Sequence, residues 1–179
     1  VPVRVLADGP GRRCLEKILV EVFRSAREEI RVTNPYFVPT PSLVGALASA
    51  AQRGVNVELL LPGSSDHPVV DLATEHLLID LLRAGVTVHS WAGPMIHAKT
   101  IVVDRHWSLI GSSNLDTFSL RRNAELNVEV HGTALGEQMA EVFRRDCEQS
   151  VPFTVREWES RSRRRRWITR VATLGRSWM

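Results

Sequence analysis

Long hydrophobic runs are missing from this sequence, and none reaches the roughly eighteen apolar residues that a membrane-spanning helix needs. Cysteine is also scarce. Cys14 and Cys147 fit no metal-ligand spacing, and we expect two unpaired, buried thiols rather than a disulfide. The 179 residues, 44% hydrophobic and 24% charged, are typical of one compact globular domain.

Lysine is nearly absent. Of the 23 basic residues, 21 are arginines, and the two lysines are Lys17 and Lys99. An ammonium acts on phosphate as a compact point charge, whereas a guanidinium acts as a fork. In a chain that uses arginine almost everywhere, Lys99 is therefore a candidate for a site that requires a point charge.

Positive charge is concentrated near the C-terminal end. Residues 151–179 hold eight arginines and two glutamates, a net charge of +6, so the residues before them carry −3. This distribution argues against a nucleic-acid groove on residues 1–150, because such a groove would be basic. We predict a catalytic domain at 1–150 and a basic amphipathic tail at 151–179.

The predicted tail carries apolar residues at helical spacing. They are Trp167, Val171, Leu174 and Trp178. A basic helix with such a stripe is typical of binding to an anionic membrane surface. A helix packed on the domain with solvated arginines, and a nucleic-acid contact, are the alternatives.

Strands alternate with helices over the first half of the chain, a pattern typical of right-handed crossovers onto a parallel sheet. The expected strands lie at 3–6, 30–32, 55–61 and 86–88, and the expected helices at 15–29, 42–53 and 68–84. Gly54 and Gly85 mark helix ends, and Pro41 marks a helix start. A hairpin of strands 96–103 and 107–111, a strand 124–131 and a helix 135–149 follow. We predict a single α/β domain with a mixed, largely parallel sheet and helices on both faces.

The residues with the clearest chemistry are His97 and Lys99. They lie two apart in the expected strand, so their side chains share a face, whereas Asp104 falls in the hairpin turn. A neutral imidazole can attack phosphorus and form a phosphohistidine. A neighbouring ammonium can hold the non-bridging oxygens. We therefore predict a phosphoryl-transfer pair with Asp104 as a supporting residue.

Neutral donors and a carboxylate follow this pair. Ser112 and Asn114 share a face and suit phosphate oxygens. Glu125, on an alternating strand, is a candidate to fix the tautomer of His97 by accepting from its other ring N–H.

The pattern HxKxxxxD at His97, Lys99 and Asp104, followed by GSxN at 111–114, resembles the phospholipase D superfamily. Residues 1 to about 150 look more specifically like the second half of bacterial cardiolipin synthases, on segments such as 34–39 and 51–57. The resemblance implies a phospholipase D-like fold, no cofactor or metal, and phosphatidyl transfer with phosphatidylglycerol as the expected donor. It also implies a bacterial enzyme bound peripherally to the cytoplasmic side of the membrane.

One feature departs from that family: the synthases carry two such motifs, and this sequence has one. The resemblance implies that a second histidine protonates the leaving group. We therefore expect the other half in an upstream domain, which a start at Val1 favours, or in a homodimer partner. The alternatives are a phospholipase D that hydrolyses phospholipids, a homodimeric single-motif nuclease and a non-catalytic scaffold.

Two further places could contribute to a site. Tyr36 and Phe37 end an expected strand, where lining a pocket mouth and packing in the core are equally expected. Asp66 and His67 lie in a loop after a strand, where binding residues often occur, although Asp66 could equally cap the next helix.

Overall fold

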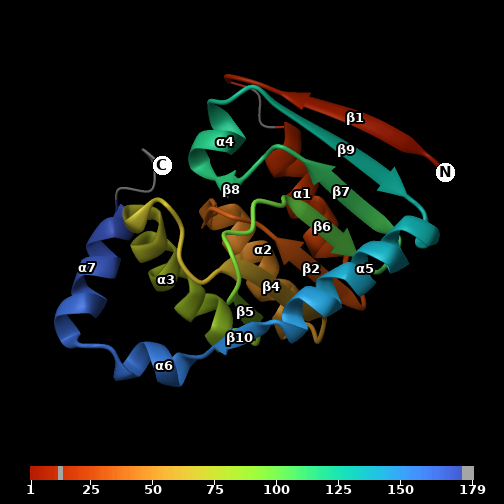
Figure 1. The fold of residues 1–179 in the computed structure, drawn as a ribbon. Helices are drawn as coiled ribbons and strands as arrows, with labels where there is room; N and C mark the ends of the chain where they lie inside the picture. Colours follow the sequence, from red (N-terminus) through yellow and green to blue (C-terminus); the bar gives the residue numbers. More distant parts are fainter. Residues whose placement is uncertain (12–13, 175–179) are drawn as a thin grey trace.

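The computed structural model describes residues 1–11 and 14–174, and eight of the strands in these residues form one sheet (Figure 1). The strands are, in sheet order, β1 (Val3–Asp8), β9 (Glu125–His131), β7 (Trp107–Gly111), β6 (Thr100–Val103), β2 (Glu29–Thr33), β4 (Asn56–Pro62), β5 (Thr87–Trp91) and β10 (Ser150–Phe153). Two short strands, β3 (Phe37–Val38) and β8 (Leu115–Asp116), pair in parallel beside it.

The sheet is mixed, as predicted, but its parallel part is confined to three strands. β2, β4 and β5 run parallel to one another, and every other described pairing in this sheet is antiparallel. The expectation of a largely parallel sheet is corrected because β1 does not pair with β2. It pairs with β9 instead, with Val5 opposite Val128.

Helices cover both faces of the sheet, as predicted. They are α1 (Cys14–Ser25), α2 (Pro41–Gln52), α3 (Pro68–Arg83), α4 (Thr117–Arg121), α5 (Thr133–Glu148), α6 (Val155–Ser160) and α7 (Arg163–Leu174). α5 crosses the face opposite α1 and α2 and packs against the strands from β7 to β10 in sheet order (Figure 1). None of the described helices has the length and hydropathy of a membrane span.

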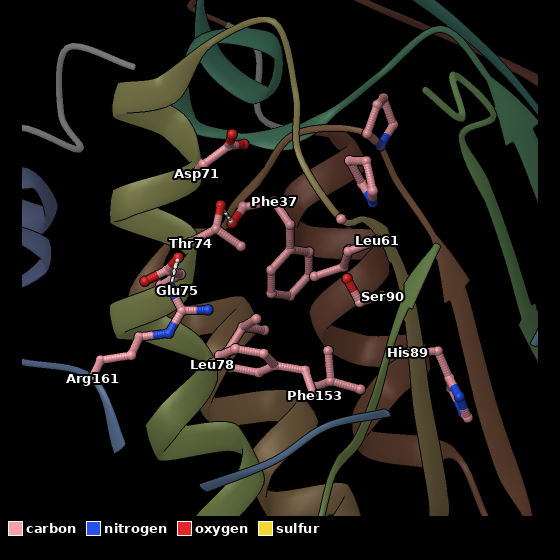
Figure 2. Close-up of a pocket in the computed structure, with 14 residues that line it drawn as sticks. Phe37, Leu61, Asp71, Thr74, Glu75, Leu78, His89, Ser90, Phe153 and Arg161 are labelled. Atoms are coloured by element: carbon pink, nitrogen blue, oxygen red, sulfur yellow. Dashed lines mark hydrogen bonds and ion pairs between the residues drawn. The ribbon is translucent and has the colours of Figure 1, made fainter. Parts of the chain in front are cut away.

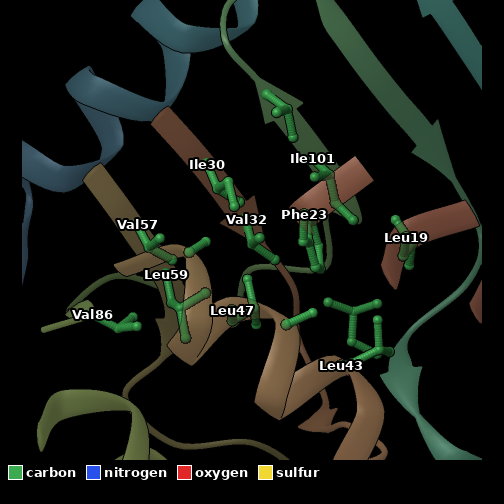
Figure 3. Packing of buried hydrophobic residues seen from close by; sticks show 14 of the residues in the cluster. Leu19, Phe23, Ile30, Val32, Leu43, Leu47, Val57, Leu59, Val86 and Ile101 are labelled. Carbon is green, nitrogen blue, oxygen red and sulfur yellow. The ribbon is translucent and has the colours of Figure 1, made fainter. Parts of the chain in front are cut away.

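The main core lies between β2, β4 and β6 and the two helices α1 and α2 (Figure 3). Ile30 and Val32 are two apart in β2 and both fully buried, because alternate residues of a strand point to one face. They pack in the same cluster as Phe23 of α1 and Leu47 of α2. The buried apolar area is the main stabilising contribution to this arrangement.

Proline and glycine residues lie at the helix ends that the sequence predicts. Pro41 is the first residue of α2, and Gly54 and Gly85 follow α2 and α3 with φ of 91° and 99°, a conformation that glycine adopts without strain. Arg53, at the end of α2, donates from Nη2 to the carbonyl oxygens of Phe23 and Arg24, at 3.2 and 2.9 Å. It thereby satisfies acceptors left open at the end of α1.

The stretch after residue 150, predicted as a basic tail, is joined closely to the rest of the molecule. β10 pairs antiparallel with β5 and forms one edge of the sheet. α7 packs along α3, and Arg161 and Arg165 bond the carboxylate of Glu75 at 2.8 and 2.7 Å. Thr169 is fully buried in this contact region, so α7 is a packed helix.

Candidate active site

His97 and Lys99 lie in the loop that leads into β6. The strand begins at Thr100, so the expected strand 96–103 is too long at its start, although the Lys99 carbonyl oxygen still accepts from the Gly111 N–H at 3.2 Å. Lys99 Nζ lies 3.1 Å from the ring nitrogens of His97 and donates to its carbonyl oxygen at 2.9 Å. The two side chains therefore meet, although they lie in a loop and not on the strand face that the prediction assumed.

Lys99 is a partly desolvated cation. Burial lowers its pKa, and the nearby carboxylates of Glu125 and Asp116 oppose that shift. A less hydrated ammonium gives up fewer water contacts when it meets an anion. Beside the exposed imidazole of His97, this group is suited to hold a phosphate oxygen while a ring nitrogen attacks phosphorus.

Asp104 acts on the backbone. It lies in the turn between β6 and β7 with φ of 50°. Its carboxylate accepts from the N–H groups of Arg27 at 3.0 Å, Glu28 at 2.8 Å and Glu29 at 3.0 Å. These bonds tie the hairpin to the start of β2, the strand that pairs with β6. Asp104 therefore positions the strand that follows Lys99.

Glu125, at the start of β9, is engaged by its own neighbours. Its Oε2 accepts from the Ser112 hydroxyl, and its Oε1 accepts from Asn123 Nδ2 at 3.2 Å. No hydrogen bond joins Glu125 to His97 within residues 1–11 and 14–174. The predicted contact that would fix the tautomer of His97 is therefore not formed in this arrangement, and Glu125 acts on the pair through its charge near Lys99.

Ser112 and Asn114 follow β7, which ends at Gly111. The Leu126 N–H donates to Ser112 Oγ at 3.0 Å, which fixes the hydroxyl beside Glu125. The amide oxygen of Asn114 is buried and has no hydrogen-bond partner among the described residues. Ser113, between them, is buried and accepts from Asn127 Nδ2 at 2.8 Å, so it holds the loop against β9.

A second group lies next to His97. The ring of Tyr36 meets the ring of His97 edge-on with centroids 6.2 Å apart, and the ring of His67 lies 5.4 Å from Tyr36. The Tyr36 hydroxyl donates to Asp66 Oδ1 at 2.6 Å. That hydrogen bond raises the pKa of Tyr36 to about 12 and lowers the pKa of Asp66. Phe37, by contrast, is a core residue.

The sequence signal for this group is its position after strands. Tyr36 follows β2 and Asp66 follows β4, and these strands are parallel neighbours. Loops at the same end of parallel strands lie close together, which could have linked Tyr36 to Asp66 before the structure was known.

One group in the described part of the chain has the composition of a metal site. Ligand atoms of Glu58, His89 and Cys147 lie within 4.8 Å of one another, and none of these residues belongs to the motif. His89 Nε2 and Glu58 Oε2 pair at 3.1 Å, and burial raises the pKa of the Cys147 thiol to about 12. Both cysteines are free, as predicted, but neither is buried, since Cys14 is exposed and Cys147 is half-buried.

A mixed sheet with helices on both faces and a histidine–lysine pair beside neutral donors define the class as a phospholipase D-like domain. The family model described as "Cardiolipin synthase, PLD-like domain" matches residues 19–147. The chain belongs to this family.

A curated relative agrees with this assignment. Cardiolipin synthase A of Yersinia pseudotuberculosis serotype O:1b (strain IP 31758) is 34% identical over 161 residues, which cover 89% of this chain and 33% of that protein. The chain thus spans about a third of the length of this curated relative.

Two solved structures share the fold. Nuc from Salmonella typhimurium, described as a phospholipase D family member, superposes with a TM-score of 0.73 at 21% identity and covers 86% of this chain and 99% of Nuc. Phosphatidylserine synthase from Haemophilus influenzae Rd KW20 superposes with a TM-score of 0.75 at 15% identity and covers 99% of this chain and 47% of the synthase.

Proposed function

We propose that this chain is one half of a two-histidine site that transfers phosphatidyl groups in the manner of a cardiolipin synthase. The observation that carries the proposal is one complete half-site on a chain that spans a third of its curated relative. His97 and Lys99 are in contact, and Ser112 is bonded to Glu125, whose charge acts on Lys99. The second histidine comes from an upstream domain or from another copy.

The proposed reaction has two steps. A ring nitrogen of His97 attacks the phosphorus of phosphatidylglycerol, the bond from phosphorus to the headgroup oxygen breaks, and that oxygen takes a proton from the second histidine. A hydroxyl of a second lipid headgroup then attacks phosphorus, the bond to nitrogen breaks, and the second histidine takes the hydroxyl proton. Water in place of that hydroxyl would give phospholipase D activity.

Each predicted site residue has a task in this proposal. Lys99, Ser112 and Asn114 hold the non-bridging phosphate oxygens through the ammonium, the hydroxyl and the amide N–H₂, and the Ser112 hydroxyl leaves Glu125 to do so. Asp104 keeps the hairpin in place. Glu125 orients a catalytic histidine only after it exchanges the hydroxyl of Ser112 for an imidazole N–H, and otherwise tunes Lys99.

An exposed apolar face supports the need for a second half. Val5 of β1, Val128 of β9 and Ile110 of β7 are paired across neighbouring strands, so they share one face of the sheet. Val5 is 62% exposed and Ile110 41% exposed, and Leu126 beside them is 56% exposed. This face is where we expect the second phospholipase D-like half to dock.

The outer surface of α7 supports a peripheral place on the cytoplasmic side of a bacterial membrane. Trp167 and Val171 are 66% and 44% exposed, and arginines such as Arg164 and Arg170 are exposed beside them. Apolar side chains flanked by cations suit an anionic lipid surface. Trp178, the last member of the predicted stripe, lies outside the described residues.

Lipid turnover tests the function. Vesicles of phosphatidylglycerol are incubated with the protein and a chelator, with single-stranded DNA as the competing substrate. We expect transfer or hydrolysis of the lipid that is lost in His97→Ala and kept in His106→Ala, an exposed histidine outside the site. Cleavage of DNA alone would refute the lipid substrate. No turnover by a chain that sediments as a monomer would indicate an incomplete half.

A further inference from the structure

An open cleft of about 510 Å³ lies beside the motif loop. One side is the loop after β4, with Gly63, Ser64 and Asp66, and the other is the segment from Ser90 to Met95. Met95 precedes His97 by two residues, and Asp66 on the other side is bonded to Tyr36, whose ring meets the ring of His97, so the cleft lies next to the motif loop.

The two sides of the cleft are fixed to each other. The Gly63 N–H donates to the Trp91 carbonyl oxygen at 3.1 Å. A Cβ on Gly63 would lie 2.9 Å from that oxygen, so a larger residue would separate the two loops. The Trp91 indole N–H donates to the Pro94 carbonyl oxygen at 2.7 Å, which holds the ring in place. The cleft is therefore preformed rather than dependent on loop closure.

Asp66 lines the cleft, and one of its two carboxylate oxygens is available to a ligand. Its Oδ1 accepts from the Tyr36 hydroxyl at 2.6 Å, and the ring of Tyr36 is in turn beside His97. No bond to Oδ2 is found among the described residues. Asp66 is 62% exposed and its pKa is lowered, chiefly by the Tyr36 hydroxyl, so it offers a carboxylate to whatever enters.

Hydroxyl groups complete the lining. The side chains of Ser64 and Ser90 make no hydrogen bond within the described residues, whereas the Ser65 hydroxyl is occupied by Asp71 at 2.6 Å. Ser90 also borders a smaller cavity of about 90 Å³, toward which it points while His89 turns away (Figure 2). Phe37 and Leu61 form apolar walls of that cavity, so Ser90 lies beside packed core side chains.

A carboxylate acceptor, a hydroxyl without a partner among the described residues and a held indole ring are groups that bind a polyol. We propose that this cleft binds the glycerol headgroup that leaves or attacks at the phosphorus, with Asp66 and Ser64 as its hydroxyl partners. Tyr36 is the positioning residue that aligns Asp66 with His97. This inference rests on the proposed function, because it extends the phosphate site at Lys99 into a headgroup subsite.

Three soluble phosphodiesters of equal phosphate chemistry test the cleft: glyceryl methyl phosphate, propyl methyl phosphate and aminoethyl methyl phosphate. Their dissociation constants are measured by NMR titration with the full chain. We expect the glyceryl ester to bind about five- to tenfold more tightly than the propyl ester, as one or two added hydrogen bonds allow. Asp66→Asn and Ser64→Ala should each reduce this ratio toward one and leave the propyl ester unchanged.

Controls separate the cleft from the phosphate site. Asp80→Asn, at an exposed position on α3, should leave all constants unchanged, whereas Lys99→Ala should weaken all three esters together. Equal binding of glyceryl and propyl esters by the wild-type chain, or tighter binding of the aminoethyl ester, overturns the polyol cleft alone. If no ester binds, the phosphate site of the proposed function fails, and the cleft proposal falls with it.

Discussion

Two carboxylates lie near Lys99, and they differ in burial. Asp116 is 8% exposed, and burial raises its pKa to about 6, although it accepts from the Ser119 N–H at 2.6 Å. Glu125 is more exposed and hydrogen-bonded to two side chains. The charge that Lys99 experiences near neutral pH therefore depends on Asp116 as well as on the predicted Glu125.

Asp116 makes stability depend on pH. Its folded pKa of about 6 lies above the usual value of 3.8, so its contribution is fully present below pH of about 4 and is lost as pH rises through 6. Asp116→Asn keeps an acceptor for Ser119 and cannot ionise. Between pH 4 and pH 8, ionisation of Asp116 should lower the free energy of unfolding of the wild type by at most about 3 kcal/mol. This loss should be absent in Asp116→Asn. Urea unfolding at several pH values measures this, and parallel profiles would contradict it.

Asp104 carries a prediction that is independent of chemistry. In the wild type, Asp104 Oδ2 accepts a hydrogen bond from the Arg27 N–H. In Asp104→Asn an amide N–H₂ would take the place of this oxygen, and two donors would face each other. We expect a loss of about 1–3 kcal/mol in the free energy of unfolding. Asp80→Asn is the matched control and should change stability by less than about 0.5 kcal/mol. Unchanged stability together with lost phosphodiester binding would instead place Asp104 in the chemistry.

At the scale of elements, α5 docks on the β6–β7 hairpin through a glycine. A Cβ on Gly136 would lie 2.0 Å from the Arg105 carbonyl oxygen, whereas a Cβ on Gly45 of α2 would meet nothing within 4 Å. The hairpin that leads from Lys99 and the helix that covers the opposite face are therefore in backbone contact.

These two helical glycines make a matched pair for mutation. Gly136→Ala should destabilise the fold by about 2–4 kcal/mol, because α5 must move off the hairpin. Gly45→Ala should be neutral or stabilise it by up to about 1 kcal/mol, because alanine favours the helix. Thermal unfolding of both variants measures the difference. A neutral Gly136→Ala would mean that α5 shifts without cost.

At the scale of the whole molecule, the exposed sheet face predicts association. Leu126→Asp places a charge in the middle of this apolar face and should reduce self-association of the chain in sedimentation velocity, without loss of secondary structure. Val69→Asp, at a 55% exposed position of α3, is the control and should sediment like the wild type. Identical behaviour of Leu126→Asp and the wild type would argue against this docking face.

Local patterns predicted most of the elements and the histidine–lysine contact. Gly54, Gly85 and Pro41 act within a few residues of themselves, so their effect is visible in the sequence. The hairpin turn at Asp104 was predicted for the same reason. The class of the fold and the family follow from these elements and from the motif.

Long-range pairing was not predictable in the same way. Nothing local in β1 indicates that Val5 lies opposite Val128 rather than beside β2. Within β9 the polar residues Asn127 and Glu129 are buried whereas the apolar Leu126 is exposed, and Glu129 accepts from the Trp107 indole N–H at 2.8 Å. The contact of Tyr36 with His97, and the engagement of Glu125 by Ser112, likewise depend on how separate loops meet.

The bonds of Asp104 bear on how copies of this motif diverge. A duplicated half that lost its reactive histidine and its lysine would still need an anchor between the hairpin and β2. The aspartate should therefore be retained in inactive halves that have lost the histidine and the lysine. Its presence there would indicate that the fold is kept, not that the half is catalytic.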